Sequence, residues 1–341
     1  MVDLLLASQN MHYEFRMVSL AAESAQAAYL SNSSELPDCL YELFRSVEQA
    51  TPATRDGSVK ASILVTTDYS DLPLLIVACR GTASLVDWLV NLDGDLEDCS
   101  NFISQRQGTS SFNVEPDIAR TTAHAGLLRI AKCMASEVCN KILDAGSSRF
   151  TTTGGGRKPV LMVTGHSAGG GVASLMSSHI RLRRHDIVDR FEAVHCVTFA
   201  APPVFDSPDT VNDVPNLPLG LSINIVNYGD IVPRADKAYI KSLLALYIER
   251  AESLIDDIWD FGEPIAWNYG QNVLLMDVAP IDADAQNADG DDGTDIKAFS
   301  PDMEDACFWK CEITSNGRMY EGNKMPESLN LGVSEFETRL N

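Results

Sequence analysis

The residues of this chain best suited to nucleophilic chemistry lie in the segment 165–169, which has the sequence Gly-His-Ser-Ala-Gly. A G-x-S-x-G pentapeptide is typical of a nucleophile elbow where a strand precedes it and a helix follows. Here an apolar, valine-containing run (158–164) comes before it and a run that begins with small residues (170–180) comes after. We therefore expect a sharp turn that strains the backbone of Ser167 and presents its hydroxyl at a helix N-terminus, where negative charge is favoured.

A serine nucleophile needs a base, an acid that orients the base, and an oxyanion hole. Asp230 follows the apolar run 222–227, a position suited to the acid, but an aspartate after a glycine is also a common turn residue. The sequence leaves both interpretations open. For the oxyanion hole we expect the N–H of Ala168 and, from the loop after the apolar run 74–79, the N–H and hydroxyl of Thr82.

The elements that must position these residues alternate between strand-type and helix-type patterns, which predicts one doubly wound α/β domain with a mostly parallel sheet over residues 1–341. We expect a polar, irregular surface segment over 93–121 and an acidic mobile loop over about 281–305. The expected helices are 15–30, 40–49, 126–143, 170–185 and 240–258, and the expected strands are 61–67, 74–79, 158–164, 193–199, 222–227 and 307–313.

Charge and composition exclude some classes of partner. The chain has 341 residues, 45% of them hydrophobic, with 48 acidic and 26 basic residues and a formal net charge of -22. This balance argues against nucleic acid and anionic lipid as partners, whereas neutral lipid, which meets apolar surface, stays compatible. Eight cysteines include no C-x-x-C pair, so we expect neither a metal site nor a redox motif.

The N-terminal sequence and the hydropathy pattern bear on location. Residues 1–8 carry an aspartate where a signal peptide has basic residues, so we expect no signal peptide. No run approaches about 18 apolar residues, so we expect no transmembrane helix. Both points predict a cytoplasmic protein that can lie peripherally on lipid surfaces.

Several sequence blocks occur together in one order: Arg-Gly-Thr at 80–82, Leu-Val-Asp-Trp-Leu at 85–89, Ala-His-Ala-Gly-Leu at 123–127, the block 165–170, Phe-Ala-Ala-Pro-Pro-Val at 199–204, and Gly-Asp-Ile-Val-Pro-Arg at 229–234. In this the chain resembles the class 3 (fungal-type) triacylglycerol lipase family and is similar to its intracellular diacylglycerol lipase-like branch. The resemblance implies an α/β-hydrolase fold, Ser167 as nucleophile, Asp230 as acid, and Thr82 and Ala168 at the oxyanion hole. A thioesterase or peptidase of the same fold fits the pentapeptide but not the other blocks.

The resemblance also implies a short helical lid over 84–92, whose apolar stripe consists of Leu85, Trp88, Leu89 and Leu92. An ordinary core helix is the alternative interpretation of that stripe. The implied substrate is an acylglycerol or another lipid ester, met at a transient neutral lipid interface, and the implied reaction needs no cofactor.

The catalytic histidine is where the sequence departs from the family pattern. The family places this histidine after the acid, but none of the six histidines of this chain follows Asp230. We favour the expectation that the sequence is C-terminally incomplete. One alternative is a catalytically inactive lipase-like binding or scaffold protein, and another is a base supplied by a different histidine. Without a base, a serine hydroxyl is a poor nucleophile.

Overall fold

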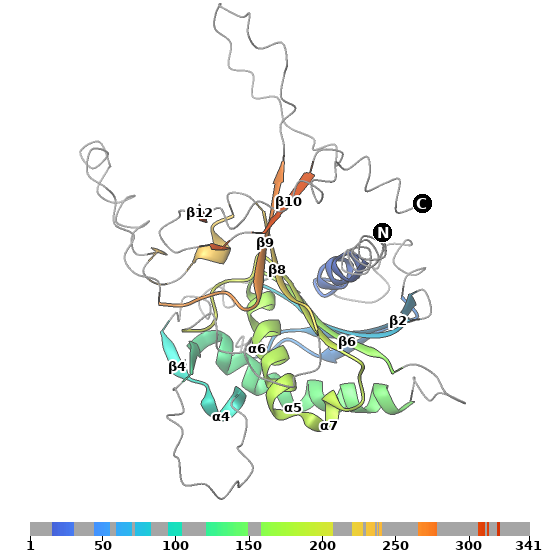
Figure 1. Ribbon diagram of the computed structural model, residues 1–341. Coiled ribbons are helices and arrows are strands. Elements are labelled where there is room, and N and C mark those ends of the chain that lie inside the picture. The colour runs from blue at the N-terminus through green and yellow to red at the C-terminus, as the bar shows by residue number, and fades with distance from the viewer. Residues whose placement is uncertain are drawn as a thin grey trace, which may run out of the picture.

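An eight-stranded sheet forms the centre of the molecule in the computed structural model (Figure 1). Its strands, in their order across the sheet, are β1 (Ser46–Thr51), β2 (Ser62–Tyr69), β3 (Leu72–Cys79), β6 (Val160–His166), β7 (Val194–Phe199), β8 (Ser222–Asn227), β9 (Gln271–Asp277) and β10 (Ala306–Lys310). The five strands from β3 to β9 are parallel, while β1, β2 and β10 add antiparallel edges.

The structure describes part of the chain, in the ranges 16–30, 44–54, 59–69, 72–82, 95–103, 121–148, 158–206, 220–227, 230–235, 237, 239–240, 265–277, 306–310, 312–313 and 319–320. The expected lid, the expected acidic loop and nearly all of the expected helix 240–258 lie outside these ranges. The predictions of a single domain and of a mobile acidic loop therefore stay predictions.

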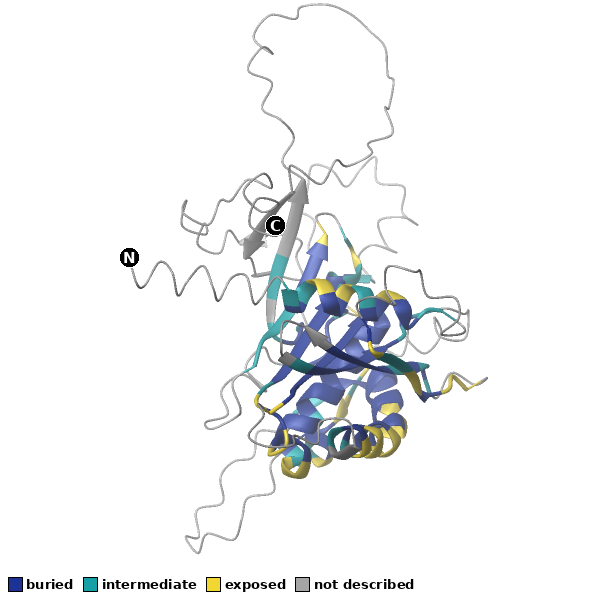
Figure 2. Cartoon of the chain, turned by 90° about the vertical axis from the view of Figure 1, so that its right-hand side faces the viewer, coloured by how far each residue is buried: buried dark blue, intermediate teal, exposed yellow. Residues whose placement is uncertain are grey.

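Helices cover both faces of the sheet, as a doubly wound arrangement requires. One face is covered by α5 (Ala125–Ser148), α6 (Ala168–Arg183) and α7 (His185–Val188), and the other by a helix of residues 16–27 (Figure 1). Each layer contributes buried apolar side chains to its own cluster against the sheet. The central strands of the sheet are buried between them, and the outer face of α5 is exposed (Figure 2). This is a doubly wound α/β fold with a mostly parallel sheet.

A buried arginine fastens the C-terminal end of α6 to the amino ends of two strands. Arg181 is 5% exposed and donates to the carbonyls of Val194 and Gly220 at 2.8–3.2 Å and to the hydroxyls of Ser222 and Tyr269 at 2.7 and 3.1 Å. These contacts engage its guanidinium nitrogens on neutral oxygens, which offsets the cost of burying the charge.

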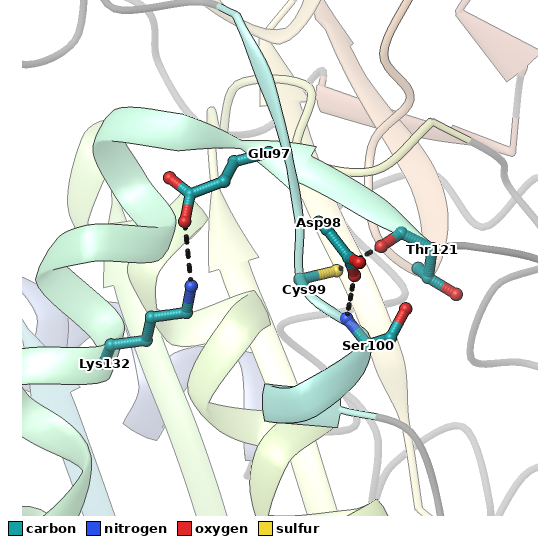
Figure 3. Close-up of polar contacts among 6 residues, drawn as sticks. All are labelled: Glu97, Asp98, Cys99, Ser100, Thr121 and Lys132. Carbon is teal, nitrogen blue, oxygen red and sulfur yellow. Dashed lines mark hydrogen bonds and ion pairs between the residues drawn. The ribbon is translucent and has the colours of Figure 1, made fainter.

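A two-stranded ribbon lies beside α5, built from β4 (Leu96–Asp98) and β5 (Thr122–His124), with the short helix α4 (Ser100–Ile103) next to it. Figure 3 shows its contacts: Glu97 pairs with Lys132 of α5 at 3.0 Å, and the Asp98 carboxylate accepts the N–H of Ser100 at 2.8 Å. The thiol of Cys99 donates to the carbonyl of Thr121 at 3.2 Å. The expectation of irregular structure over 93–121 is therefore wrong for 96–98 and 100–103.

Most of the other expected elements are confirmed, with shifted ends. The expected helix 40–49 is wrong in its described part, because residues 46–51 form β1 and pair antiparallel with β2. Strand β9 was not expected, and the expected last strand is split into β10 and β11 (Glu312–Ile313), which pairs with β12 (Met319–Tyr320). Among the described helices, none is long and apolar enough to cross a membrane.

Candidate active site

The expected turn between strand and helix lies at Ser167. Strand β6 ends at His166, α6 begins at Ala168, and Ser167 between them has φ 56° and ψ -131°. A positive φ is strained for a residue with a Cβ, and such strain is typical of functional turns. The N–H of Ser167 donates to the carbonyl of Phe199 at 2.8 Å, which ties the turn to the end of β7.

Two glycines allow the turn because backbone crosses backbone at their positions. A Cβ on Gly165 would lie 2.5 Å from the carbonyl carbon and oxygen of Gly169. A Cβ on Gly169 would lie 2.3 Å from the carbonyl oxygen of Cys79 and 2.7 Å from the nitrogen of Gly81. No side chain can relieve these contacts, so the first turn of α6 touches the end of β3 only because residue 169 has no side chain.

The two expected oxyanion-hole residues lie on either side of this crossing. Ala168 is buried and begins α6, where the first N–H groups have no partner within the helix. Thr82 follows Gly81, and a Cβ on Gly81 would lie 2.5 Å from the carbonyl oxygen of His166. The end of β3 is thus in backbone contact with the residue before Ser167. The positions of Thr82 and Ala168 along the chain therefore suit an oxyanion hole, and that role stays a prediction.

Sequence reasoning missed Tyr29, at the end of the N-terminal helix. Its hydroxyl lies 3.0 Å from Nδ1 of His166, and a Cβ on Gly81 would lie 2.1 Å from that hydroxyl. Tyr29 therefore packs against both Gly81 and His166, on the two sides of the crossing. The sequence held no signal for this contact, because it joins residues 137 positions apart.

Asp230 lies at the same edge of the sheet as Ser167. The register aligns His166 of β6 with Phe199 of β7, and Phe199 with Ile225 of β8, so the loop after β8 leaves the sheet beside the turn at Ser167. Asp230 is half-buried and its Oδ1 accepts the N–H of Val232 at 2.9 Å. The turn role that the sequence left open is therefore present, and it engages one of the two carboxylate oxygens.

The described histidines have other partners or positions. His195 of β7 is buried and its Nδ1 accepts the N–H of Leu221 at 2.7 Å. Burial, assisted by the charge of Arg181, lowers its pKa to about 4. His179 of α6 stacks on Phe102 and lies 2.7 Å from its carbonyl, and burial lowers its pKa.

Two of the remaining described histidines, His124 and His185, have contacts or positions that do not suit a catalytic base. His124 of β5 is buried against the start of α5, where its Nδ1 lies 3.4 Å from the N–H of Leu127. His185 is exposed at the start of α7. His166 is exposed and bonded to Tyr29, and His12 lies outside the described residues. Within the part of the chain that the structure describes, no hydrogen bond joins the Ser167 hydroxyl to a histidine.

Two buried cysteines of the central strands are inert. Burial raises the pKa of the thiols of Cys79 and Cys196 to about 12, so both stay protonated inside their strands as small apolar residues. The described residues also contain no group of three or more histidine, cysteine or carboxylate side chains that could hold a metal ion.

One protein-family model matches the middle of the chain. Residues 76–239, from β3 to beyond Asp230, match the family model described as Lipase (class 3). No curated protein matches the chain in sequence.

Three solved lipases are similar to this chain at low identity. A triacylglycerol lipase from Penicillium expansum is 15% identical, with 77% of this chain and 79% of that one covered and a TM-score of 0.45. Lip2 of Yarrowia lipolytica is 16% identical, with 79% of this chain and 80% of Lip2 covered and a TM-score of 0.47. The Rhizomucor miehei triacylglyceride lipase is 17% identical, with 78% of this chain and 80% of that one covered and a TM-score of 0.46.

Proposed function

Because residues 76–239 match the class 3 lipase family model, we propose that this protein is a serine ester hydrolase that acts on acylglycerols through Ser167. The family match supports lipase activity and a Ser-His-Asp mechanism in general; the assignment of roles to residues is our proposal. The observation that carries it is the positive φ of Ser167 at a junction where glycines 165 and 169 let strand and helix cross. Such strain is maintained only where the surrounding structure enforces it.

In the proposed reaction the Ser167 hydroxyl attacks the ester carbonyl and gives its proton to an imidazole. The negative charge that develops on the carbonyl oxygen is met by the N–H groups of Thr82 and Ala168, each worth about 3–4 kcal/mol in comparable sites. The imidazole protonates the departing alcohol, and water then hydrolyses the acyl-serine. Asp230 holds the imidazole in the tautomer that accepts from serine.

The remaining predictions belong to the same proposal. A lipid ester is the partner, met at a neutral lipid interface, and the apolar stripe of 84–92 covers or exposes the site; that segment lies outside the described residues. The reaction needs no cofactor, the acidic balance of the chain disfavours nucleic acid, and the location is cytoplasmic.

One observation favours a second candidate function, an inactive lipase-like protein that binds a lipid or a partner. None of the six histidines follows Asp230, and the described ones are engaged elsewhere or lie apart from Ser167. A protein of this kind would keep the fold and the turn at Ser167 but would not form an acyl-serine.

Hydrolysis of a short-chain nitrophenyl ester and of a diacylglycerol emulsion, with and without free imidazole, separates the candidates. The matched control is Ser167→Ala, which removes the nucleophile and also reports the background reaction of imidazole with the ester. Hydrolysis that needs Ser167 supports the enzyme, and hydrolysis that needs both Ser167 and added imidazole shows an assembled site that lacks only its base. A folded chain with neither activity contradicts hydrolysis by the chain as given, and it is the result that the binding protein predicts.

A further inference from the structure

A row of polar side chains crosses three strands at the level of Gly165, two residues before Ser167. Gly165 is aligned with Thr198 of β7, Thr198 with Asn224 of β8, and Asn224 with Asn272 of β9. The Thr198 hydroxyl donates to Oδ1 of Asn224 at 3.1 Å, and Nδ2 of Asn224 donates to Oδ1 of Asn272 at 3.1 Å. The side chains therefore form a continuous chain of hydrogen bonds beside the elbow.

Asn224 is the centre of this row and is 1% exposed. Besides the contacts along the row, its Oδ1 accepts the N–H of Ala201 at 3.0 Å and its Nδ2 lies 3.4 Å from the carbonyl of Ala201. A second asparagine, Asn268, donates to the same carbonyl at 2.9 Å. One buried amide thus engages both the backbone N–H and the backbone C=O of a single residue, as a neighbouring strand would.

The backbone needs such a partner because it leaves the sheet at Ala200. The N–H of Ala200 still donates to the carbonyl of Ile225 at 2.8 Å, but its φ is 49°, the second positive φ of a described non-glycine residue besides Ser167. At Ala201 no described strand of the sheet continues the pairing, and buried backbone groups without partners are costly. The Asn224 amide supplies the missing pairing.

The loop that Asn224 holds lies directly on the elbow helix. A Cβ on Gly170 would lie 2.8 Å from Cβ of Ala201, and a Cβ on Gly171 would lie 3.3 Å from the ring of Pro202. The carbonyl of Phe199, just before the loop, accepts the N–H of Ser167. The residues on both sides of Ala200 therefore support Ser167 and the first turn of α6.

We propose that Asn224 is a positioning residue, which holds the loop 200–203 against the elbow helix and so fixes Ser167 and the N–H of Ala168. Its catalytic consequence rests on the proposed function, but its structural consequence does not. Asn224 also lies on the strand that leads to Asp230, so one side chain links the strand that carries the proposed acid to the turn that carries the proposed nucleophile.

The test compares Asn224→Ala and Thr198→Val with Asn140→Ala, an asparagine on the exposed face of α5. In Asn224→Ala we expect amide hydrogen exchange to accelerate by about tenfold or more in peptides that cover the elbow and the loop 200–203, while the exchange of α5 stays unchanged. Thr198→Val removes one contact of the row and should give a smaller change at the same peptides. Asn140→Ala should change neither region.

The second readout is kinetic. With a nitrophenyl ester, kcat of folded Asn224→Ala should fall by about 10- to 100-fold with KM changed less than about threefold, because displaced reacting groups affect the transition state more than substrate binding. Elbow exchange and kcat equal to those of the wild type would overturn the inference. If the wild type hydrolyses nothing, the proposed function fails, and the exchange experiment alone decides: faster exchange confined to the elbow and the loop supports the role of Asn224, and unchanged or uniformly faster exchange overturns it.

Discussion

Replacing Gly169 with alanine is expected to force α6 away from the end of β3. The new Cβ would lie 2.3 Å from the carbonyl oxygen of Cys79, 2.6 Å from the carbonyl carbon of Arg80 and 2.7 Å from the nitrogen of Gly81. All three atoms belong to backbone, so no rotamer change relieves the overlap. Ordinary contact begins near 3.4 Å, so the two segments must separate by about 1 Å.

That separation acts on stability and on the site together. Overpacking costs about 1–3 kcal/mol where side chains can adjust, so a clash between backbone segments should lie at or above the upper end of that range. The same displacement moves the N–H of Ala168 relative to Thr82, and a misplacement of about 1 Å can lower a rate by about 100-fold.

Two other glycines provide a graded control. A Cβ on Gly171 would meet Cδ1 of Leu127 at 2.6 Å, the flexible end of a side chain, so Gly171→Ala should cost less than Gly169→Ala. A Cβ on Gly146, within α5, would meet only a ring atom of Phe191 at 3.7 Å. Gly146→Ala should therefore stabilise the protein by roughly 0.4–1 kcal/mol, since alanine loses less backbone entropy in a helix.

Urea unfolding and hydrolysis of a nitrophenyl ester measure both effects. We expect stability in the order Gly146→Ala, wild type, Gly171→Ala, Gly169→Ala, and the largest loss of kcat in Gly169→Ala. If Gly169→Ala keeps wild-type stability, the close crossing of α6 over the end of β3 is wrong, whatever the activity.

Three further changes have expected outcomes. Burial lowers the pKa of His195 to about 4, so between pH 6.5 and 4 the unfolded chain takes up a proton that the folded protein does not. The free energy of unfolding should therefore fall by on the order of 3 kcal/mol as the pH drops through that range. Urea titrations at a series of pH values measure this change. Arg181→Met leaves buried carbonyls without their donor and should destabilise the protein by roughly 2–4 kcal/mol in the same assay. Asp230→Asn keeps an oxygen for the N–H of Val232, so stability should change by less than about 1 kcal/mol. Where the wild type hydrolyses the ester without added imidazole, hydrolysis should fall by about 10⁴-fold, because Asp230 then orients a base of the chain.

Each of these three predictions has a matched control or a result that would contradict it. His195→Asn retains an acceptor for the N–H of Leu221 and should flatten the pH dependence; a slope that persists unchanged assigns it to other groups. Arg181→Lys should recover part of the lost stability, and wild-type stability of Arg181→Met would contradict the role of its contacts. Unchanged hydrolysis by Asp230→Asn would leave Asp230 with its turn role alone.

The sequence predicted the fold well where the local hydrophobic pattern and the pairing of the strands favour the same structure. The apolar runs that became β3, β6, β7 and β8 are parallel strands in which most positions are apolar and buried. The error at 40–49 arose because the strand partner of β1 lies elsewhere in the chain, and local propensity carries no information about that pairing.

The site was predictable only in part, for a similar reason. The backbone strain at Ser167 followed from the spacing of its flanking glycines, a local feature. The contacts of Tyr29 and Asn224 could not be predicted, since each depends on segments that only the folded chain brings together. For Asn224 the sequence held one usable signal, an amide in the middle of an apolar strand, which must find partners once buried.

The most direct test of Ser167 as the nucleophile is covalent labelling of the full chain with a fluorophosphonate in the presence of free imidazole, which supplies the base, followed by mass spectrometry of the peptide that contains residue 167. We predict one stoichiometric adduct on Ser167, absent in Ser167→Ala and strongly slowed in Gly169→Ala. A folded chain that acquires no adduct on Ser167, or acquires adducts equally on its exposed serines, would contradict that role.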